Sequence, residues 1–317
     1  MNERLDEAAL LARLDTLTRA TAPGYCTRPL TTEEILKQAF SQIDPASVHA
    51  VLLHGSRAAG RENPYSDVDL VALTDRENGT ILSFCDASGI RYHIYVFNQT
   101  DSEGSTANRI CRPFYGMRPI YDPEGAGRRL TEKLDAAEKS ICAKLPKEDP
   151  EGRDYLLRLL ALMGQADADT AFFIKAKILY EFPAFLASYH GFRLIGFKTV
   201  IDCLIRDDRE LALLYGDALR PDSGRQELET LIRLAFDGLS GLDVLNTDFS
   251  HSEKANDISV GGETMYRLYG RCTDFMESLD ALRPAGMEAY AFYLRCRQEA
   301  PTLFRRLNAL AVPQKYL

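Results

Sequence analysis

Two aspartates and a glycine–serine pair are the residues of this chain whose types and spacing could do chemistry. Gly55-Ser56 follows a short apolar run, ten residues intervene, and Asp67-Val68-Asp69 opens the next apolar run. Side chains at positions i and i+2 of a strand point to the same face, so Asp67 and Asp69 would present neighbouring carboxylates. Such carboxylates repel each other unless a cation lies between them, and Mg²⁺ binds carboxylates together with nucleotide phosphates. The spacing therefore predicts a Mg²⁺ and phosphate site.

The residues around the glycine–serine pair could bind the phosphates. Gly55 has no Cβ to keep a phosphate from the backbone, and Ser56 offers a hydroxyl donor. A helix that starts at Ser56 would also point free N–H groups at the phosphates. Arg57, Arg61 and Lys198 are candidate partners for the triphosphate charge. The alternative is an ordinary turn and a solvated strand edge, but the pattern arises by chance on the order of once in a few hundred chains of this length.

The elements that must position these residues can be read from hydrophobic periodicity. Short apolar runs predict strands over 48–54, 67–74, 81–85 and 91–97. Helical patterns cover 3–19 and 31–43, the latter with an N-cap at Thr31, and then 125–144, 152–165, 168–188, 197–217, 224–238, 262–282, 285–298 and 300–311. We therefore predict an α+β fold with two domains. A small mixed-sheet domain with the N-terminal helix occupies 1–146, and an all-helical domain that binds the acceptor occupies 147–317, separated by a polar, proline-bounded segment.

The composition limits the classes of function. Of the 317 residues 45% are hydrophobic, and no stretch approaches the run of about eighteen apolar residues that spans a membrane. The seven scattered cysteines form no C-x-x-C pair and favour reduced thiols, and the charged N-terminus lacks a secretory apolar core, so we expect a soluble, cytoplasmic protein. The net charge of −8 weighs against a nucleic-acid substrate and favours a small, cationic acceptor.

The motif resembles the signature of the DNA polymerase β-like nucleotidyltransferase superfamily. The likeness is specific at four positions, Gly55, Ser56, Asp67 and Asp69. The run 64–67 is similar to aminoglycoside- and other antibiotic-modifying members, and 118–125 resembles the segment that closes the catalytic domain in many relatives. The resemblance covers roughly 30–145, and the helical remainder is only generically similar.

The resemblance implies a mechanism and a missing part. Members of the superfamily hold two metal ions with three carboxylates, and an acceptor hydroxyl attacks the α-phosphorus and expels pyrophosphate. Asp67 and Asp69 match two of the carboxylates, but the strand expected to carry the third contains no acid and has His93 at that register. His93 could be a ligand, which suits Mn²⁺ or Zn²⁺ better than Mg²⁺, or a base, or the mark of a lost second metal. Alternatively, one of three other acids supplies the carboxylate: Asp86, Asp101 or Glu103.

We therefore expect a nucleotidyltransferase that uses Mg²⁺ or Mn²⁺ to move a nucleoside monophosphate, AMP in the favoured case, from NTP to a hydroxyl of a small, aminoglycoside- or natural-product-like acceptor. Such an activity would serve antibiotic resistance. Two alternatives stay open: a protein-modifying enzyme of the antitoxin type, and a nucleotide-binding pseudoenzyme that lacks the third carboxylate. The sequence does not decide the acceptor, the base of the nucleotide, the catalytic base, or whether the protein forms a homodimer.

Overall fold

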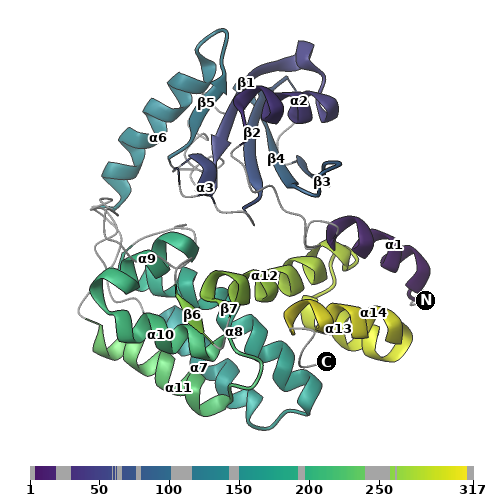
Figure 1. The fold of residues 1–317 in the computed structure, drawn as a ribbon, viewed down its shortest axis with the longest axis vertical. Helices are drawn as coiled ribbons and strands as arrows, with labels where there is room; N and C mark the ends of the chain where they lie inside the picture. The colour runs from purple at the N-terminus through teal and green to yellow at the C-terminus, as the bar shows by residue number, and fades with distance from the viewer. Residues whose placement is uncertain are drawn as a thin grey trace. The chain divides into compact units, whose positions relative to one another are not determined.

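The computed structural model describes residues 4–18, 30–58, 60, 62, 66–75, 80–100, 116–142, 150–191, 197–239, 258–260 and 263–312. The chain divides into two compact units. Asp15–Lys144 form the first, and Met1–Leu14 together with Leu145–Leu317 form the second. The first contains the sheet and the second is mostly helical, which confirms the α+β fold class (Figure 1).

A five-stranded mixed sheet is the frame of the first unit. Its strands are β1 (Val48–His54), β2 (Val68–Thr74), β3 (Thr80–Cys85), β4 (Arg91–Asn98) and β5 (Arg118–Tyr121). They are ordered β3-β4-β2-β1-β5, and the β2–β4 pair is parallel while the other pairs are antiparallel. The sequence predicts the first four strands. It gives no sign of β5, whose four residues show neither an apolar run nor alternation and are all exposed or partly exposed.

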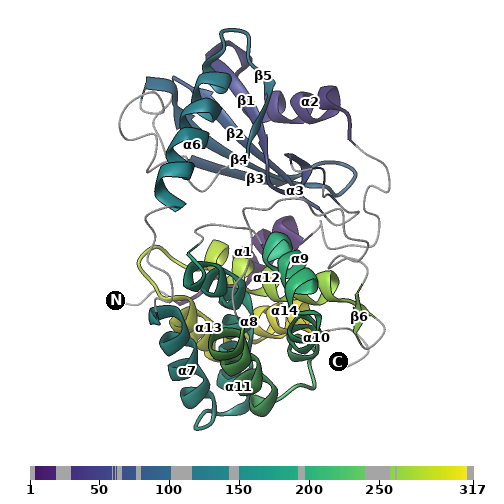
Figure 2. The ribbon, with the colours of Figure 1, turned by 90° about the vertical axis from the view of Figure 1, so that its left-hand side faces the viewer.

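Helices cover both faces of this sheet. On one face α2 (Thr32–Gln42) packs Ile35 and Ala39 against the sheet, and Thr31 and Glu34 form its capping box. On the other face α6 (Ala126–Cys142) packs its apolar side chains against β1 and β2. Figures 1 and 2 show α2 and α6 on opposite sides of the strands. Because both faces are buried, β1 and β2 read as apolar runs rather than as alternating patterns.

The second unit consists mainly of helices. They are α7 (Glu151–Met163), α8 (Ala168–Tyr189), α9 (Phe197–Asp207), α10 (Arg209–Ala218), α11 (Arg225–Arg233), the π-helical turn η4 (Leu234–Gly238), α12 (Met265–Leu282), α13 (Ala289–Glu299) and α14 (Pro301–Ala311). A two-stranded ribbon is also present, formed by β6 (Ser259–Val260) and β7 (Glu263–Thr264). The region is therefore mostly helical rather than all-helical.

One predicted helix, 197–217, is in fact two. Asp208 separates α9 from α10, with φ −152° and ψ 81°, which lie outside the helical region. Its carboxylate accepts a hydrogen bond from the backbone N–H of Leu211 and so forms the N-cap of α10. The sequence predicts one helix because the apolar periodicity runs without interruption through 197–217, since both helices bury an apolar face.

The helix α1 (Glu7–Thr18) differs from the domain assignment made from the sequence, which placed it with the sheet. The division between the units falls within α1, after Leu14. Before that point, the carboxylate of Glu7 accepts hydrogen bonds from the backbone of Thr302 and Leu303, and Arg13 donates to the carbonyl of Ala281. These contacts join the start of the chain to its end.

Within the described residues, no helix combines the length and the apolar character that crossing a membrane requires.

Candidate active site

The end of β1 makes a bend that only glycine can make easily. Gly55 follows His54 directly and has φ +68°, in the left-handed region that side chains disfavour. The four-residue helix α3 (Gly55–Ala58) begins at this bend. A Cβ added to Gly55 would lie 2.5 Å from Oδ2 of Asp69. Gly55 is therefore required both for its backbone angle and for the close approach of a carboxylate.

The two aspartates of the motif lie where β2 begins. Asp69 is in β2, and its antiparallel partner in β1 is His54, the residue before Gly55. Asp67 directly precedes β2, and its side chain is 42% exposed. The structure thus brings Asp69 against Gly55, and it leaves the Asp67 carboxylate accessible to solvent.

A row of polar residues crosses four strands at this level of the sheet. His54 pairs with Asp69, Asp69 pairs with His93, and His93 pairs with Ser83. Two positions further into the strands, the same face carries apolar residues that pack in the cluster beneath α6: Leu52, Val71 and Tyr95. The polar row therefore begins where the apolar packing under α6 ends. Sequence reasoning did not single out His54 or Ser83.

Burial keeps both histidines of this row uncharged near neutral pH. Burial lowers the pKa of His54 to about 4, although the charge of Asp67 acts in the opposite direction. Burial also lowers the pKa of His93, again opposed by Asp67 and reinforced by Arg91. A neutral imidazole has one nitrogen with a lone pair, which can accept a proton or bind a metal ion.

The ring of His93 is oriented by contacts on both sides. Its Nδ1 lies 3.0 Å from Oγ of Ser83, within hydrogen-bonding distance. Its Nε2 lies 3.9 Å from Oδ2 of Asp67, and the His93 side chain is only 18% exposed. The imidazole is thus held beside the carboxylate of Asp67.

Arg57 has a different role from the one that the sequence suggests. Its side chain is buried, with 8% exposed, and its Nε donates to the carbonyl of Asp67 at 2.9 Å. One terminal nitrogen donates to the carbonyl of Ser66 at 2.8 Å. Arg57 therefore links α3 to the backbone that directly precedes β2. These hydrogen bonds use donors that the sequence suggests for the triphosphate.

Of the remaining predicted site residues, the structure fully describes only Ser56. Ser56 lies in α3 and is partly buried. Arg61 lies outside the described residues, as does the side chain of Lys198, whose backbone is part of α9.

The predicted alternatives for the third acid are also only partly described. Asp101 and Glu103 lie outside the described residues. Asp86 accepts hydrogen bonds from the backbone of Ser88 and Ile90, so its carboxylate stabilises the β3–β4 turn.

The donor set fits a divalent cation that takes further ligands from a nucleotide. Within the described parts of the chain, no three His, Cys, Asp or Glu side chains are already grouped as a metal site. Asp67 and Asp69 nevertheless offer hard oxygen ligands, and the lack of a Cβ at Gly55 lets the Asp69 carboxylate lie against the bend after β1. Mg²⁺ is usually held by one or two carboxylates together with substrate phosphates. Asp67 and Asp69 would therefore suffice to hold the ion when a triphosphate is bound.

Comparison with known proteins identifies one segment. Residues 33–107 match the family model described as "Nucleotidyltransferase domain". No curated protein matches the chain. Among solved structures, the chain is similar to the crystal structure of a nucleotidyltransferase-like protein from Exiguobacterium sibiricum 255-15, with 14% sequence identity, 86% of this chain and 88% of that chain covered, and a TM-score of 0.29. A TM-score of this size carries no weight for function. The match to the family model shows that the segment 33–107 is similar to nucleotidyltransferase domains, and it confirms the resemblance carried by the glycine–serine and aspartate motif.

Proposed function

We propose that this protein transfers AMP from ATP to a hydroxyl group of a small-molecule acceptor and releases pyrophosphate. The family match supports nucleotidyl transfer as the general chemistry. The single observation that carries the proposal is the approach of Asp69 to Gly55. A Cβ added to Gly55 would lie 2.5 Å from Oδ2 of Asp69, and Asp67 is two residues before Asp69 in the chain. This arrangement joins a metal-binding carboxylate pair to a backbone bend that a phosphate can approach.

Each residue has a defined part in this reaction. The acceptor oxygen bonds to the α-phosphorus, the bond from that phosphorus to the bridging oxygen breaks, and pyrophosphate leaves with the electron pair. Asp67 and Asp69 would hold a divalent ion, which when bound would neutralise charge on the phosphates. Gly55 and Ser56 bind the phosphates through the backbone and the hydroxyl, and Arg57 positions Asp67. The proton of the acceptor hydroxyl goes to His93, which lies beside Asp67, or to solvent where His93 is instead a ligand of the ion.

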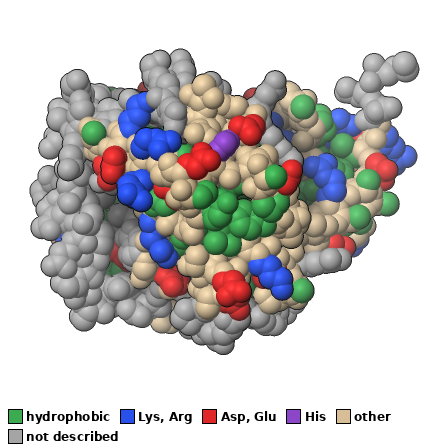
Figure 3. Space-filling model, turned by 90° about the horizontal axis from the view of Figure 1, so that it is seen from above, with side chains coloured by type: hydrophobic (Ala, Val, Ile, Leu, Met, Phe, Trp, Pro, Cys, Tyr) green, Lys and Arg blue, Asp and Glu red, His purple; other side chains and the backbone are tan. Residues whose placement is uncertain are grey.

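The nature of the acceptor is inferred from charge. The net charge of −8 disfavours a polyanionic acceptor and favours a cationic one such as an aminoglycoside. On the face drawn in Figure 3, the described Lys and Arg side chains are interspersed with Asp and Glu side chains around a patch of hydrophobic ones. A nucleic-acid site would more typically carry a basic stripe. We assign acceptor binding to the helical region 147–317.

The test is pyrophosphate release. The protein is incubated with each NTP and with Mg²⁺ or Mn²⁺, with and without a panel of aminoglycosides. We expect release that depends on ATP, metal and acceptor, and that is lost in Asp67→Asn and Asp69→Asn. Asp75→Asn is the matched control, because Asp75 follows β2 at its opposite end and contacts His49. Release that is unaffected by Asp69→Asn would contradict the proposed site.

A second candidate is a nucleotide-binding protein that does not catalyse transfer. It is favoured by one observation: His93 is the partner of Asp69 on β4, the strand on which the resemblance to the superfamily implies a third carboxylate. This candidate predicts metal-dependent NTP binding, measured by calorimetry, without pyrophosphate release for any member of the acceptor panel.

A further inference from the structure

We propose that Ser83 is a positioning residue that directs Nε2 of His93 towards Asp67, so that the imidazole becomes a nitrogen ligand beside the two carboxylates and makes the site prefer Mn²⁺ to Mg²⁺. The inference rests on the metal site of the proposed function. It goes beyond that function by naming the third ligand, the residue that orients it and the class of metal ion.

The register of the β3–β4 hairpin places Ser83 opposite His93. The two residues are direct partners across the antiparallel pair, and Oγ of Ser83 lies 3.0 Å from Nδ1 of His93. In the tautomer in which Nδ1–H donates to Oγ of Ser83, Nε2 keeps the lone pair that can bind a metal ion. Histidines that bind metals are usually held in this way, with the second nitrogen hydrogen-bonded to a neighbouring group.

The second nitrogen of His93, Nε2, lies near the carboxylate of Asp67. Nε2 of His93 lies 3.9 Å from Oδ2 of Asp67, and His93 is the parallel strand partner of Asp69. The separation from Asp67 is longer than a hydrogen bond. It is also short enough for one cation to lie between the nitrogen and the oxygen after small side-chain movements.

The donor atoms determine which ion is preferred. Mg²⁺ binds almost only to oxygen and keeps an octahedral shell, whereas imidazole is a good ligand for first-row transition metals. Replacing a carboxylate by an imidazole removes one negative charge and adds a nitrogen. The loss of charge weakens the binding of both ions, whereas the added nitrogen favours Mn²⁺, which accepts nitrogen ligands more readily than Mg²⁺ does.

The experiment measures the metal ion directly, without nucleotide or acceptor. Mn²⁺ is titrated into the full-length protein and followed by electron paramagnetic resonance, and pulsed spectra report whether a ¹⁴N nucleus is bound to the ion. We expect a nitrogen signal in the wild type that disappears in His93→Ala and His93→Gln. Ser83→Ala should weaken Mn²⁺ binding about tenfold or more, as loss of an orienting hydrogen bond typically does. Ser83→Thr keeps the hydroxyl and should bind Mn²⁺ like the wild type.

Two control variants separate this effect from general damage. His49→Ala removes a histidine from the other end of β1, where its ring contacts Asp75, and should leave the nitrogen signal unchanged. Ser88→Ala removes a hydroxyl from the β3–β4 turn, where it contacts Asp86, and should leave Mn²⁺ affinity unchanged. Competition with Mg²⁺ should show the wild type preferring Mn²⁺ by a larger factor than His93→Ala does.

Three results would overturn the inference: no Mn²⁺ binding by the wild type, a nitrogen signal that persists without His93, or equal affinities for Ser83→Ala and the wild type. The proposed function fails in a different way. If the Mn²⁺ spectra follow the expected pattern but no acceptor yields pyrophosphate, the ligand assignment stands and the transfer reaction is contradicted.

Discussion

At the scale of single residues, the site depends on one glycine that satisfies two constraints at once. Gly55 adopts φ +68°, and its missing Cβ makes room for Oδ2 of Asp69. Gly60 offers a natural comparison, since it has φ +64° but no atom of the described residues within 4 Å of its Cβ position. The two glycines share the backbone constraint, but only Gly55 has the contact with the carboxylate.

We expect Gly55→Ala and Gly60→Ala each to reduce the free energy of unfolding by about 1–2 kcal/mol, the cost of a side chain in the left-handed region. Only Gly55→Ala should also displace Asp69 and reduce kcat/KM, by about a hundredfold if the shift approaches 1 Å. Denaturant unfolding and pyrophosphate release measure the two effects. Similar losses of activity in both variants would mean that backbone strain, and not the contact with Asp69, matters.

His93 gives a second prediction at this scale. His93→Ala should lower turnover by two orders of magnitude or more, because both a lost ligand and a lost base have effects on the order of 10²–10⁴. The measurement is pyrophosphate release with Mg²⁺ and with Mn²⁺, and His49→Ala serves as the control. Unchanged turnover with Mg²⁺ would remove His93 from the mechanism.

Sequence reasoning could locate the aspartates but not all of their supports. The i, i+2 spacing of Asp67 and Asp69 and their distance from Gly55 are local properties of the chain. The contacts of Arg57 could not be predicted, because nothing in the sequence shows that its guanidinium is buried against the carbonyls of Ser66 and Asp67. Ser83 could not be identified either, because a turn at 86–89 would pair 83 with 92, whereas the structure pairs Cys85 with Arg91 and hence Ser83 with His93.

At the scale of elements, the sequence predicts a helix or strand correctly where a capping residue or turn residues mark its ends. The capping pattern at Thr31 marks the start of α2, and the runs that form β1 to β4 end at turn residues. The failures have two causes. The break at Asp208 had a local signal, an aspartate N-cap, but the continuous apolar periodicity of 197–217 outweighed it in the prediction. Other parts of the chain decide the remaining cases, since contacts with β1 make β5 a strand. The parallel pairing of β2 with β4 likewise depends on strand order, which local patterns do not encode.

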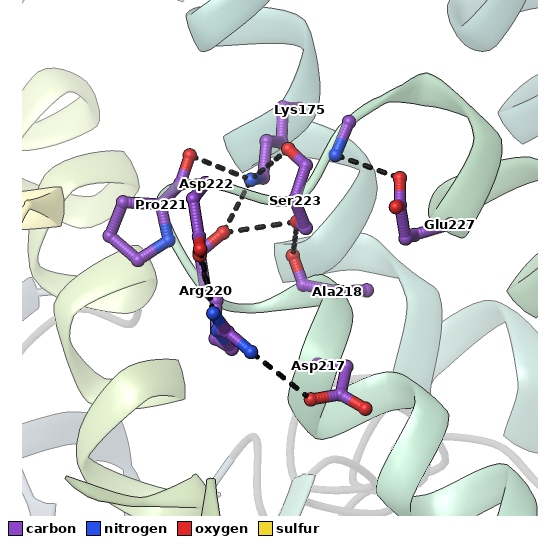
Figure 4. Close-up of polar contacts among 9 residues, drawn as sticks. Lys175, Asp217, Ala218, Arg220, Pro221, Asp222, Ser223 and Glu227 are labelled. Atoms are coloured by element: carbon purple, nitrogen blue, oxygen red, sulfur yellow. Dashed lines mark hydrogen bonds and ion pairs between the residues drawn. The ribbon is translucent and has the colours of Figure 1, made fainter. Parts of the chain in front are cut away.

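A lysine that joins two helical elements gives a prediction about pH. Lys175 in α8 donates from Nζ to the carbonyls of Arg220 at 2.6 Å, Ser223 at 2.7 Å and Pro221 at 3.3 Å, in the turn between α10 and α11 (Figure 4). Burial lowers its pKa from 10.5 to about 8, although the charge of Asp222 acts in the opposite direction. The unfolded chain therefore binds more protons at this position than the folded chain between these two values.

The contribution of Lys175 to the free energy of unfolding should consequently rise with pH between about 8 and 10.5. Its contribution is fully present above pH 10.5 and is lost as pH falls to about 8. The two pKa values limit the effect to roughly 3 kcal/mol. We expect the difference in unfolding free energy between the wild type and Lys175→Met to grow in favour of the wild type from pH 8 to pH 10. The exposed Lys37 provides the control, and a Lys37→Met variant that changed in the same way would contradict this assignment.

At the scale of the whole molecule, the start of the chain belongs with its end. The buried side chains of α1 include Leu10 and Leu14, and Met1–Leu14 form one compact unit with Leu145–Leu317. The most specific contact is at α14, whose N-cap residue, Ala300, has no side chain that can cap the helix. Glu7 supplies the cap instead, with Oε1 accepting from Thr302 N at 2.6 Å and from Leu303 N at 3.0 Å.

Glu7→Ala should therefore destabilise a helix that lies almost three hundred residues away in the sequence. The loss of a cap typically costs about 0.5–2 kcal/mol, and a carboxylate at a helix N-terminus also interacts favourably with the helix dipole. We expect hydrogen exchange to become faster in α13 and α14 while β1 and β2 keep their protection. Glu132→Ala, on the exposed surface of α6, is the control. Faster exchange in the sheet, or unchanged exchange in α14, would show that α1 does not stabilise the helical unit through this cap.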